Sequence, residues 1–150
     1  MSDIMGVSQF ERLFRESASL DVDKSDLKRL SNFLNQKLYD MLVVAQAKAK
    51  ANHRDIIEPY DLPITKGLQE IIHKFKKMEI GLELQPILEK LASFPQLDLA
   101  YSEATQSKLP EIIGGLTVAL ALAFKTIDPT VKNPQTEHWD KAEAIFNTLL

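Results

Sequence analysis

The longest regular pattern of apolar positions in the chain runs from Ser25 to Asn52, a stretch without proline or glycine. Its apolar residues recur at steps of three and four, which places them on one face of a helix: Leu27, Leu30, Leu34, Leu38, Met41, Leu42, Ala45 and Ala49. At 1.5 Å per residue this helix is roughly 42 Å long, longer than a domain of this size is wide. Short neighbours cannot cover it, so the pattern predicts a second long helix that crosses it.

A second long apolar pattern opens at Ser102 and continues to about Thr126. Its core positions are Leu109, Ile112, Ile113, Leu116, Leu120 and Phe124. The apolar run from Leu109 to Phe124, broken by Glu111, is too short to span a membrane and predicts buried core instead.

Shorter helical patterns flank the long ones. A first helix is predicted from Ser8, which forms a capping box with Glu11, to near Ser19. Asp23 is then expected to cap the first long helix, with Asp26 favourably placed in its first turn.

The remaining short helices are bounded by proline and glycine. The third is predicted to start within Glu58–Asp61, although Pro63 requires either a start at Asp61 or a bent first turn, and to end at Gly81. The fourth stops before Pro95, and the last begins with the cap and first-turn proline of Asn133-Pro134. The order short, long, short therefore occurs twice, which predicts one compact all-α domain with halves at residues 7–80 and 82–150.

Composition narrows the possible functions. The chain of 150 residues has no cysteine, so disulfides, thiol nucleophiles and thiolate metal sites are excluded. Residues 1–80 carry a net charge of +1 and residues 81–150 a net charge of −4. A protein that binds the phosphate backbone is usually strongly basic, and this one is not. The first ten residues lack the basic and apolar regions of a secretion signal, so we expect a cytoplasmic protein.

No metal or catalytic motif stands out. The run Asp21–Ser25 resembles the start of a calcium loop, but Asp26 replaces the turn glycine and Asn32 replaces the bidentate glutamate. The three histidines, His53, His73 and His138, are far apart and lack zinc-ligand spacing. We therefore expect no cofactor, no metal and no enzymatic activity.

Gly114 and Gly115 lie at the middle of the second long helix, where each costs roughly 1 kcal/mol relative to alanine. Such a cost is tolerable where another backbone comes close. We expect the pair to contact the first long helix near Leu34, Leu38 and Met41. The alternative is a kink assisted by Pro110.

The first half of the chain resembles archaeal histones. The stretch from Arg12 to Thr65 aligns with an archaeal histone without a gap, with Val22 at the apolar position of the first loop. Arg54 and Asp61 match the arginine and aspartate that pair, seven positions apart, to hold the second loop to the third helix, and Ile57 and Leu62 match the apolar positions flanking that aspartate. The resemblance implies a histone fold.

The second half matches the helix order but not this motif, because Lys132 and Asp140 are eight positions apart and no arginine occurs there. The whole chain is similar to a group of uncharacterised bacterial proteins, found in thermophiles, that carry two histone folds in one polypeptide. The resemblance implies an intramolecular handshake, a tandem pseudodimer. The alternative is a generic helical bundle.

The resemblance also identifies candidate DNA contacts and departures from them. Arg12 and Arg54 match histone arginines, whereas Asp21 replaces a frequent DNA-contacting arginine, and Asp55 and Ile56 replace a basic-threonine pair that contacts phosphate. Five further basic residues are candidates for a DNA-binding patch, with a solvated helix face as the alternative: Lys24, Lys28, Arg29, Lys48 and Lys50.

Two classes of function follow. The first is a non-enzymatic protein-interaction or architectural module, whose partner is another protein or a second copy of the chain. The second is a nucleoid-associated protein that binds DNA weakly and without sequence specificity, a hypothesis that Asp21 and Asp55 disfavour. No membrane partner is expected.

Overall fold

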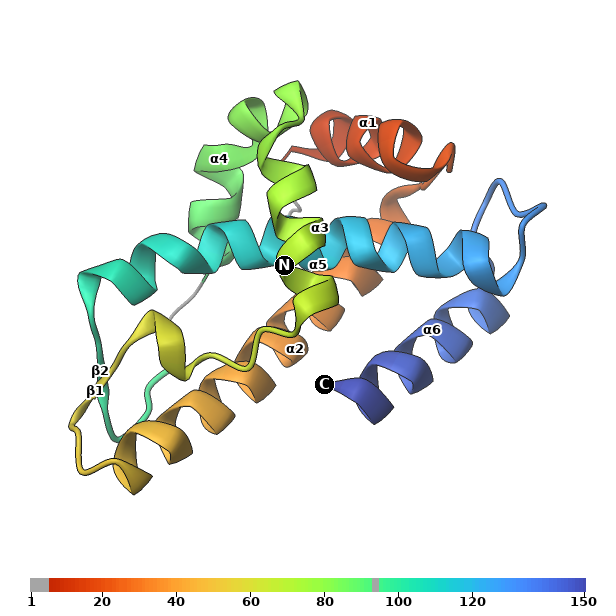
Figure 1. The fold of residues 1–150 in the computed structure, drawn as a ribbon. Helices are drawn as coiled ribbons and strands as arrows, with labels where there is room; N and C mark the ends of the chain where they lie inside the picture. Colours follow the sequence, from red (N-terminus) through yellow and green to blue (C-terminus); the bar gives the residue numbers. More distant parts are fainter. Residues whose placement is uncertain (1–5, 93–94) are drawn as a thin grey trace.

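The computed structural model describes residues 6–92 and 95–150 and consists of two triplets of helices. In each triplet a long helix lies between two shorter ones (Figure 1). The first triplet comprises α1 (Val7–Ala18), α2 (Lys24–Ala51) and α3 (Lys66–Lys76). The second comprises α4 (Glu79–Leu91), α5 (Glu103–Ile127) and α6 (Thr136–Leu149). The predicted all-α class is confirmed, and so is the repeated short, long, short order.

Helix α2 begins as the sequence predicts. The Asp23 carboxylate accepts a hydrogen bond from the Asp26 amide, and the Asp26 carboxylate accepts one from the Asp23 amide, both at 3.0 Å. These reciprocal bonds satisfy amides that a helix start otherwise leaves unpaired. Every residue of the predicted apolar stripe of α2 is buried.

Helix α5 lies at the centre and packs against α1, α2, α3, α4 and α6. The Ser102 hydroxyl caps it by accepting a hydrogen bond from the Thr105 amide at 3.1 Å. Its length and composition would suit a membrane span, but 61% of its most apolar stretch is buried inside the fold, as in a core helix. Helices α1 and α4 pack together on one side of α5 (Figure 1).

The links of one triplet pair with those of the other. Strand β1 (Ile56–Ile57), which follows α2, runs parallel to β2 (Ala100–Tyr101), which precedes α5. At the opposite end, the Asp21 amide before α2 donates to the carbonyl of Lys132 after α5 at 2.8 Å. Each triplet thus contributes its first link to one end of the molecule and its second link to the other.

The predicted limits of α3 are wrong at both ends. Pro59–Asp61 form a separate 3-10 turn, η1, and α3 begins only at Lys66, after a Thr65 cap whose hydroxyl accepts from the Leu68 amide at 3.2 Å. Pro63 explains the break, because proline cannot donate a helical hydrogen bond. Gly81 does not end α3 but lies inside α4.

Two predicted caps are also wrong. Helix α1 begins at Val7 after Gly6, whose φ of 69° suits glycine, and Ser8 falls inside the first turn. Helix α6 is capped by Gln135, two residues after Asn133.

The glycine pair of α5 is buried but faces a different helix from the one predicted. A Cβ atom at Gly114 would overlap the ring of Phe75, and one at Gly115 would overlap Ile72. Both residues belong to α3, which crosses α5 at this point (Figure 1). The predicted close approach is therefore present, but the nearest atoms belong to α3 and not to Leu34, Leu38 and Met41 of α2.

Candidate nucleic-acid interface

An ion pair joins the link after α2 to the turn before α3. Arg54 donates from both terminal guanidinium nitrogens to the Asp61 carboxylate, at 2.8 and 2.5 Å. The Asp61 side chain is fully buried, and it also accepts from the Glu58 amide at 2.8 Å. The hydrogen bonds from Arg54, with a further contribution from the Glu58 amide, lower the pKa of Asp61. The ion pair predicted from the sequence is thus present, and it occupies Arg54 within the protein.

Carboxylates also occupy the other two candidate arginines. Arg12 on α1 binds Glu16 at 2.6 Å and Glu83 of α4 at 2.8 Å. Arg29 on α2 binds two acids of α6, Asp140 at 2.7 Å and Glu143 at 2.9 Å. It also stacks over the Trp139 ring, 5.4 Å from its centroid.

The candidate lysines divide into two groups. Lys50 pairs with Asp98 at 2.7 Å, and Lys48 donates to the Tyr60 carbonyl at 2.8 Å. Lys24 and Lys28 are exposed, and among the described residues neither has an ion pair. These two groups lie at opposite ends of α2, which is 28 residues or roughly 42 Å long.

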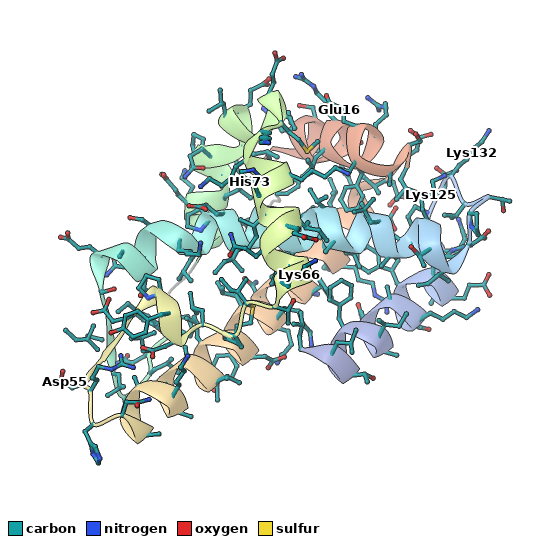
Figure 2. All side chains as sticks on the ribbon, viewed as in Figure 1. Glu16, Asp55, Lys66, His73, Lys125 and Lys132 are labelled. Atoms are coloured by element: carbon teal, nitrogen blue, oxygen red, sulfur yellow. The ribbon has the colours of Figure 1, made fainter. Side chains whose placement is uncertain are left out.

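Acidic residues outnumber basic ones in the links at both ends. Residues 52–61 and 95–102 hold four acids and one arginine, and residues 19–26 and 128–135 hold four acids and two lysines. On the side of the molecule formed by α1 and α4, α1 carries two arginines and two glutamates, and α4 carries three glutamates and one lysine. Asp21 and Asp55 are both exposed, and Figure 2 shows Asp55 pointing outward at the tip of its link.

A second clamp, not predicted from the sequence, holds the link after α5. The Nε2 atom of His138 lies 3.0 Å from the Asp128 carboxylate. The Nδ1 atom of the same ring accepts a hydrogen bond from the Gln135 amide at 2.9 Å. A hydrogen bond from Thr130, and to a smaller extent one from His138, lowers the pKa of Asp128. The histone pattern did not predict this pair, because here the acid precedes the base and the two residues are ten positions apart.

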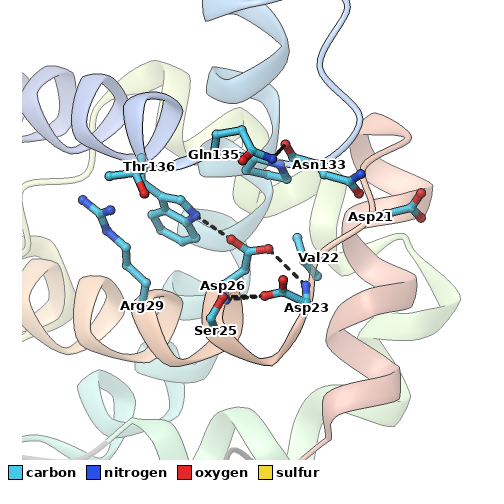
Figure 3. Close-up of a pocket in the computed structure, with 11 residues that line it drawn as sticks. Asp21, Val22, Asp23, Ser25, Asp26, Arg29, Asn133, Gln135 and Thr136 are labelled. Carbon is cyan, nitrogen blue, oxygen red and sulfur yellow. Dashed lines mark hydrogen bonds between the residues drawn. The ribbon is translucent and has the colours of Figure 1, made fainter.

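A polar cavity of about 420 Å³ lies between the starts of α2 and α6 (Figure 3). On its wall, Asp26 accepts from the Trp139 indole nitrogen at 2.9 Å, and burial raises the pKa of Asp26. Asp23 is occupied by the Ser25 hydroxyl and the Asp26 amide. Of the carboxylates that resembled a calcium loop, Asp23 therefore serves as a helix cap together with Asp26, whereas the exposed Asp21 lies 3.8 Å from Arg15. Within residues 6–92 and 95–150, no three metal-ligating side chains come together.

An apolar hollow of about 320 Å³ lies between α3, α5 and the end of α6. Its wall consists almost entirely of aliphatic and aromatic side chains: Leu68, Ile71, Ala119, Ala123, Ile145, Phe146, Leu149 and Leu150, with Thr65. Ile145 is 43% exposed and Leu149 is 73% exposed. Contiguous exposed apolar surface is a common mark of contact with another molecule.

Together these features define an all-helical protein of two interlocked triplets, whose links are ionically clamped and predominantly acidic. The chain belongs to the family described as "Domain of unknown function (DUF1931)", which matches residues 10–147.

Two relatives come from Aquifex aeolicus (strain VF5), and both are called uncharacterized proteins. One is 29% identical over 120 residues, which cover 80% of this chain and 70% of the relative. The other is 27% identical over 133 residues, covering 83% and 80% respectively.

Two crystal structures share the fold over nearly the whole length of both chains. A protein from Thermus thermophilus has a TM-score of 0.88 at 55% identity, covering 99% of this chain and 100% of its own. A protein from Aquifex aeolicus has a TM-score of 0.84 at 26% identity, covering 100% and 99%.

Proposed function

We propose that this protein is a tandem histone fold, closed on itself as a pseudodimer, that acts as a non-enzymatic protein-interaction module and not as a DNA-wrapping protein. Three observations support the histone fold: the two short, long, short triplets, the reciprocal pairing of links at both ends, and the Arg54–Asp61 clamp. The resemblance of residues 12–65 to archaeal histones agrees with them.

The proposal that the protein does not wrap DNA rests on one observation, the pairing of its candidate DNA-binding arginines with carboxylates. Histone arginines are aimed at phosphates and the minor groove. Here Arg12, Arg29 and Arg54 each bind carboxylates of the same chain. Breaking those pairs to contact DNA would lose the ionic contacts already made, and the acidic links add repulsion at both ends.

A salt titration of duplex DNA binding tests the loss of DNA contacts. Affinity that comes from phosphate contacts falls with salt, with a slope near −0.9 per contact. We expect weak binding at low salt and none near physiological salt. Asp21→Arg with Asp55→Lys should increase binding and steepen the slope, because each change removes a repulsive charge and adds an attractive one. The matched control is Glu89→Lys with Glu137→Lys, which adds the same charge outside the links.

Tight, steeply salt-dependent binding by the unmodified protein would instead support the second candidate, a nucleoid-associated protein. The observation that favours this candidate is that Lys24 and Lys28 are exposed and have no carboxylate partner within the described residues. An equal gain in binding for the control variant would show that the links do not face DNA.

The interaction role is supported by the apolar hollow beside the end of α6, which lies apart from both acidic ends. A photo-crosslinking residue at Leu149 should form a specific adduct with a partner protein in cells. The control is the same residue at Leu82, an equally apolar position that is 82% exposed on α4. Adducts of the same kind and yield from both positions, or from neither, would contradict the assignment of this surface.

A further inference from the structure

The two ends of the molecule are held by clamps of different chemistry. At one end, Arg54 and Asp61 pair through a guanidinium that keeps its charge at every accessible pH. At the other end, the corresponding position after α5 is held by Asp128 and His138. Imidazole is the side chain whose charge ordinarily changes between about pH 5 and pH 8. Only the second clamp can therefore respond to pH in that range.

The contacts of His138 determine which nitrogen carries its proton. The residue is 6% exposed and stands three positions after the Gln135 cap, at the start of α6. The Gln135 amide can only donate, so Nδ1 must accept and carries no hydrogen. The single proton of the neutral ring is then on Nε2, which donates to Asp128. A neutral ring satisfies both neighbours, whereas a protonated ring has no acceptor to offer Gln135.

We propose that His138 is a pH-sensitive switch for the docking of α6. Protonation places a hydrogen on Nδ1 directly against the Gln135 amide and removes the cap from the start of the helix. The charged ring gains attraction to Asp128, but that carboxylate is 37% exposed, so the gain is small. The partly buried amide loses its acceptor, which is the larger effect. Acidification therefore loosens α6 from the body of the protein.

The charged groups around the ring do not replace the lost bond. From the end of α5 and its link, Lys125 donates to the Val131 carbonyl, and Lys132 lies in the link. Glu137 and Lys141 lie on α6 itself, both exposed.

The ionisable groups of the neighbouring segments are also engaged or remote. From the link before α2, the Asp21 amide binds the Lys132 carbonyl. From α2, Asp26 binds the indole of Trp139, next to His138, and Arg29 binds Asp140 and Glu143. Because burial raises the pKa of Asp26, an experiment must separate the titration of that carboxyl from that of His138.

Trp139 provides a direct probe of this helix. It is the only tryptophan of the chain, it is 2% exposed, and its ring packs edge to face against Phe124 at 5.0 Å. Undocking of α6 would move the indole from this buried contact into water and shift its emission to longer wavelength.

The experiment follows Trp139 fluorescence from about pH 7.5 to about pH 5 in the wild-type protein and in His138→Gln. Glutamine at this helix position accepts the same hydrogen bond and does not titrate. We expect a reversible red shift and a lower melting temperature at acid pH in the wild type, and neither in His138→Gln. The matched control, His73→Gln on the exposed face of α3, should behave as the wild type.

Asp128→Asn tests the balance between the two contacts. It keeps an acceptor for Nε2 but removes the charge that partly compensates protonation, so its red shift should be larger than that of the wild type. The proposal is overturned by a wild-type emission that does not change with pH, or by an equal change in His138→Gln. If that variant does not fold, nitrogen NMR shifts of wild-type His138 decide the question. A proton on Nδ1 at about pH 7.5 overturns the proposal, and its absence there with appearance at about pH 5 supports it.

Discussion

Asp61 is the residue that ties the end of α2 to the start of the third-helix segment. Its buried carboxylate receives two guanidinium hydrogen bonds from Arg54 and one from the Glu58 amide. The guanidinium of Arg54 is itself covered by Tyr60, whose ring centroid is 4.9 Å away. A buried charge that loses its partner is far more costly than an exposed one, so the pair acts as a unit.

Asp61→Asn should lower the free energy of unfolding by more than the control substitution does, because the buried side chain then has one acceptor oxygen in place of two for Arg54 and the Glu58 amide. The control is Glu70→Gln, which breaks the exposed Lys66–Glu70 pair and should change stability by less than about 1 kcal/mol. Chemical denaturation of the three proteins at neutral pH measures both effects. Equal effects of the two substitutions would show that the clamp contributes no more than a surface ion pair.

The same pair has a defined pH dependence. Because Arg54 lowers the pKa of Asp61 in the folded state, the contribution is complete above the unfolded pKa of about 3.9. It is lost as the pH falls through the lower, folded value. The stability of Asp61→Asn should therefore approach that of the wild type in strong acid. A constant difference between the two proteins down to about pH 2 would contradict this linkage.

How far single residues could be predicted depended on a known pattern. Arg54 and Asp61 were found because their spacing and order match a histone pair. Asp128 and His138 were not found, because the order of acid and base is reversed, and a histidine used as a helix cap carries no distinctive sequence signal. The expected cap, Asn133, also lies two residues before the observed one, Gln135, so the sequence did not place His138 at the capping-box position.

At the scale of elements, the long helices were predicted well and the short ones poorly. Asp23 and Ser102 are strong caps, and each precedes a long uninterrupted apolar period. The short helices offer only a few apolar positions, so their predicted limits depended on nearby proline and glycine residues. The pattern predicts a third helix that includes Pro63 in its first turn and ends at Gly81, whereas the chain forms a 3-10 turn before α3 and begins α4 before Gly81.

The contact between α3 and α5 also shows what periodicity leaves open. Two adjacent glycines in a long helix indicate that another segment comes close, but they do not say which one. A glycine pair at this position is compatible with a close contact to either α2 or α3. Only the three-dimensional arrangement places Ile72 and Phe75 of α3 against Gly115 and Gly114.

Gly115→Ala should destabilise the protein by about 1–3 kcal/mol, although alanine favours helix, because the new methyl overlaps Ile72. Gly67→Ala is the control: it also lies in a helix, and in the described part of the chain no atom outside its own stretch of helix lies within 4 Å of the added methyl. It should stabilise by up to about 1 kcal/mol. Thermal unfolding of both variants measures the signs, and a stabilising Gly115→Ala would contradict the close packing of α3 on α5.

At the scale of the whole molecule, the two triplets share one core. The buried cluster includes Leu38 and Met41 of α2 together with Leu116 and Phe124 of α5. The α3 helix of the first triplet packs on α5 of the second, and strands β1 and β2 pair across the triplets. Neither triplet therefore covers its own long helix, which is the property that the length of the Ser25–Asn52 pattern first indicated.

A cut in the link between α3 and α4 tests this interdependence. Fragments of residues 1–77 and 78–150 should each show little helix by circular dichroism, because each alone exposes the apolar face that the other covers. Mixed in equal amounts, they should regain the helical signal of the intact chain as a one-to-one complex, measured by sedimentation. The control is the intact chain nicked within the exposed link at residues 52–55, where the cut leaves each long helix whole. A monomeric, fully helical 1–77 fragment would contradict the shared core. If 1–77 folds only by pairing with itself, its own helices replace those of the second triplet, and adding 78–150 should then displace one copy.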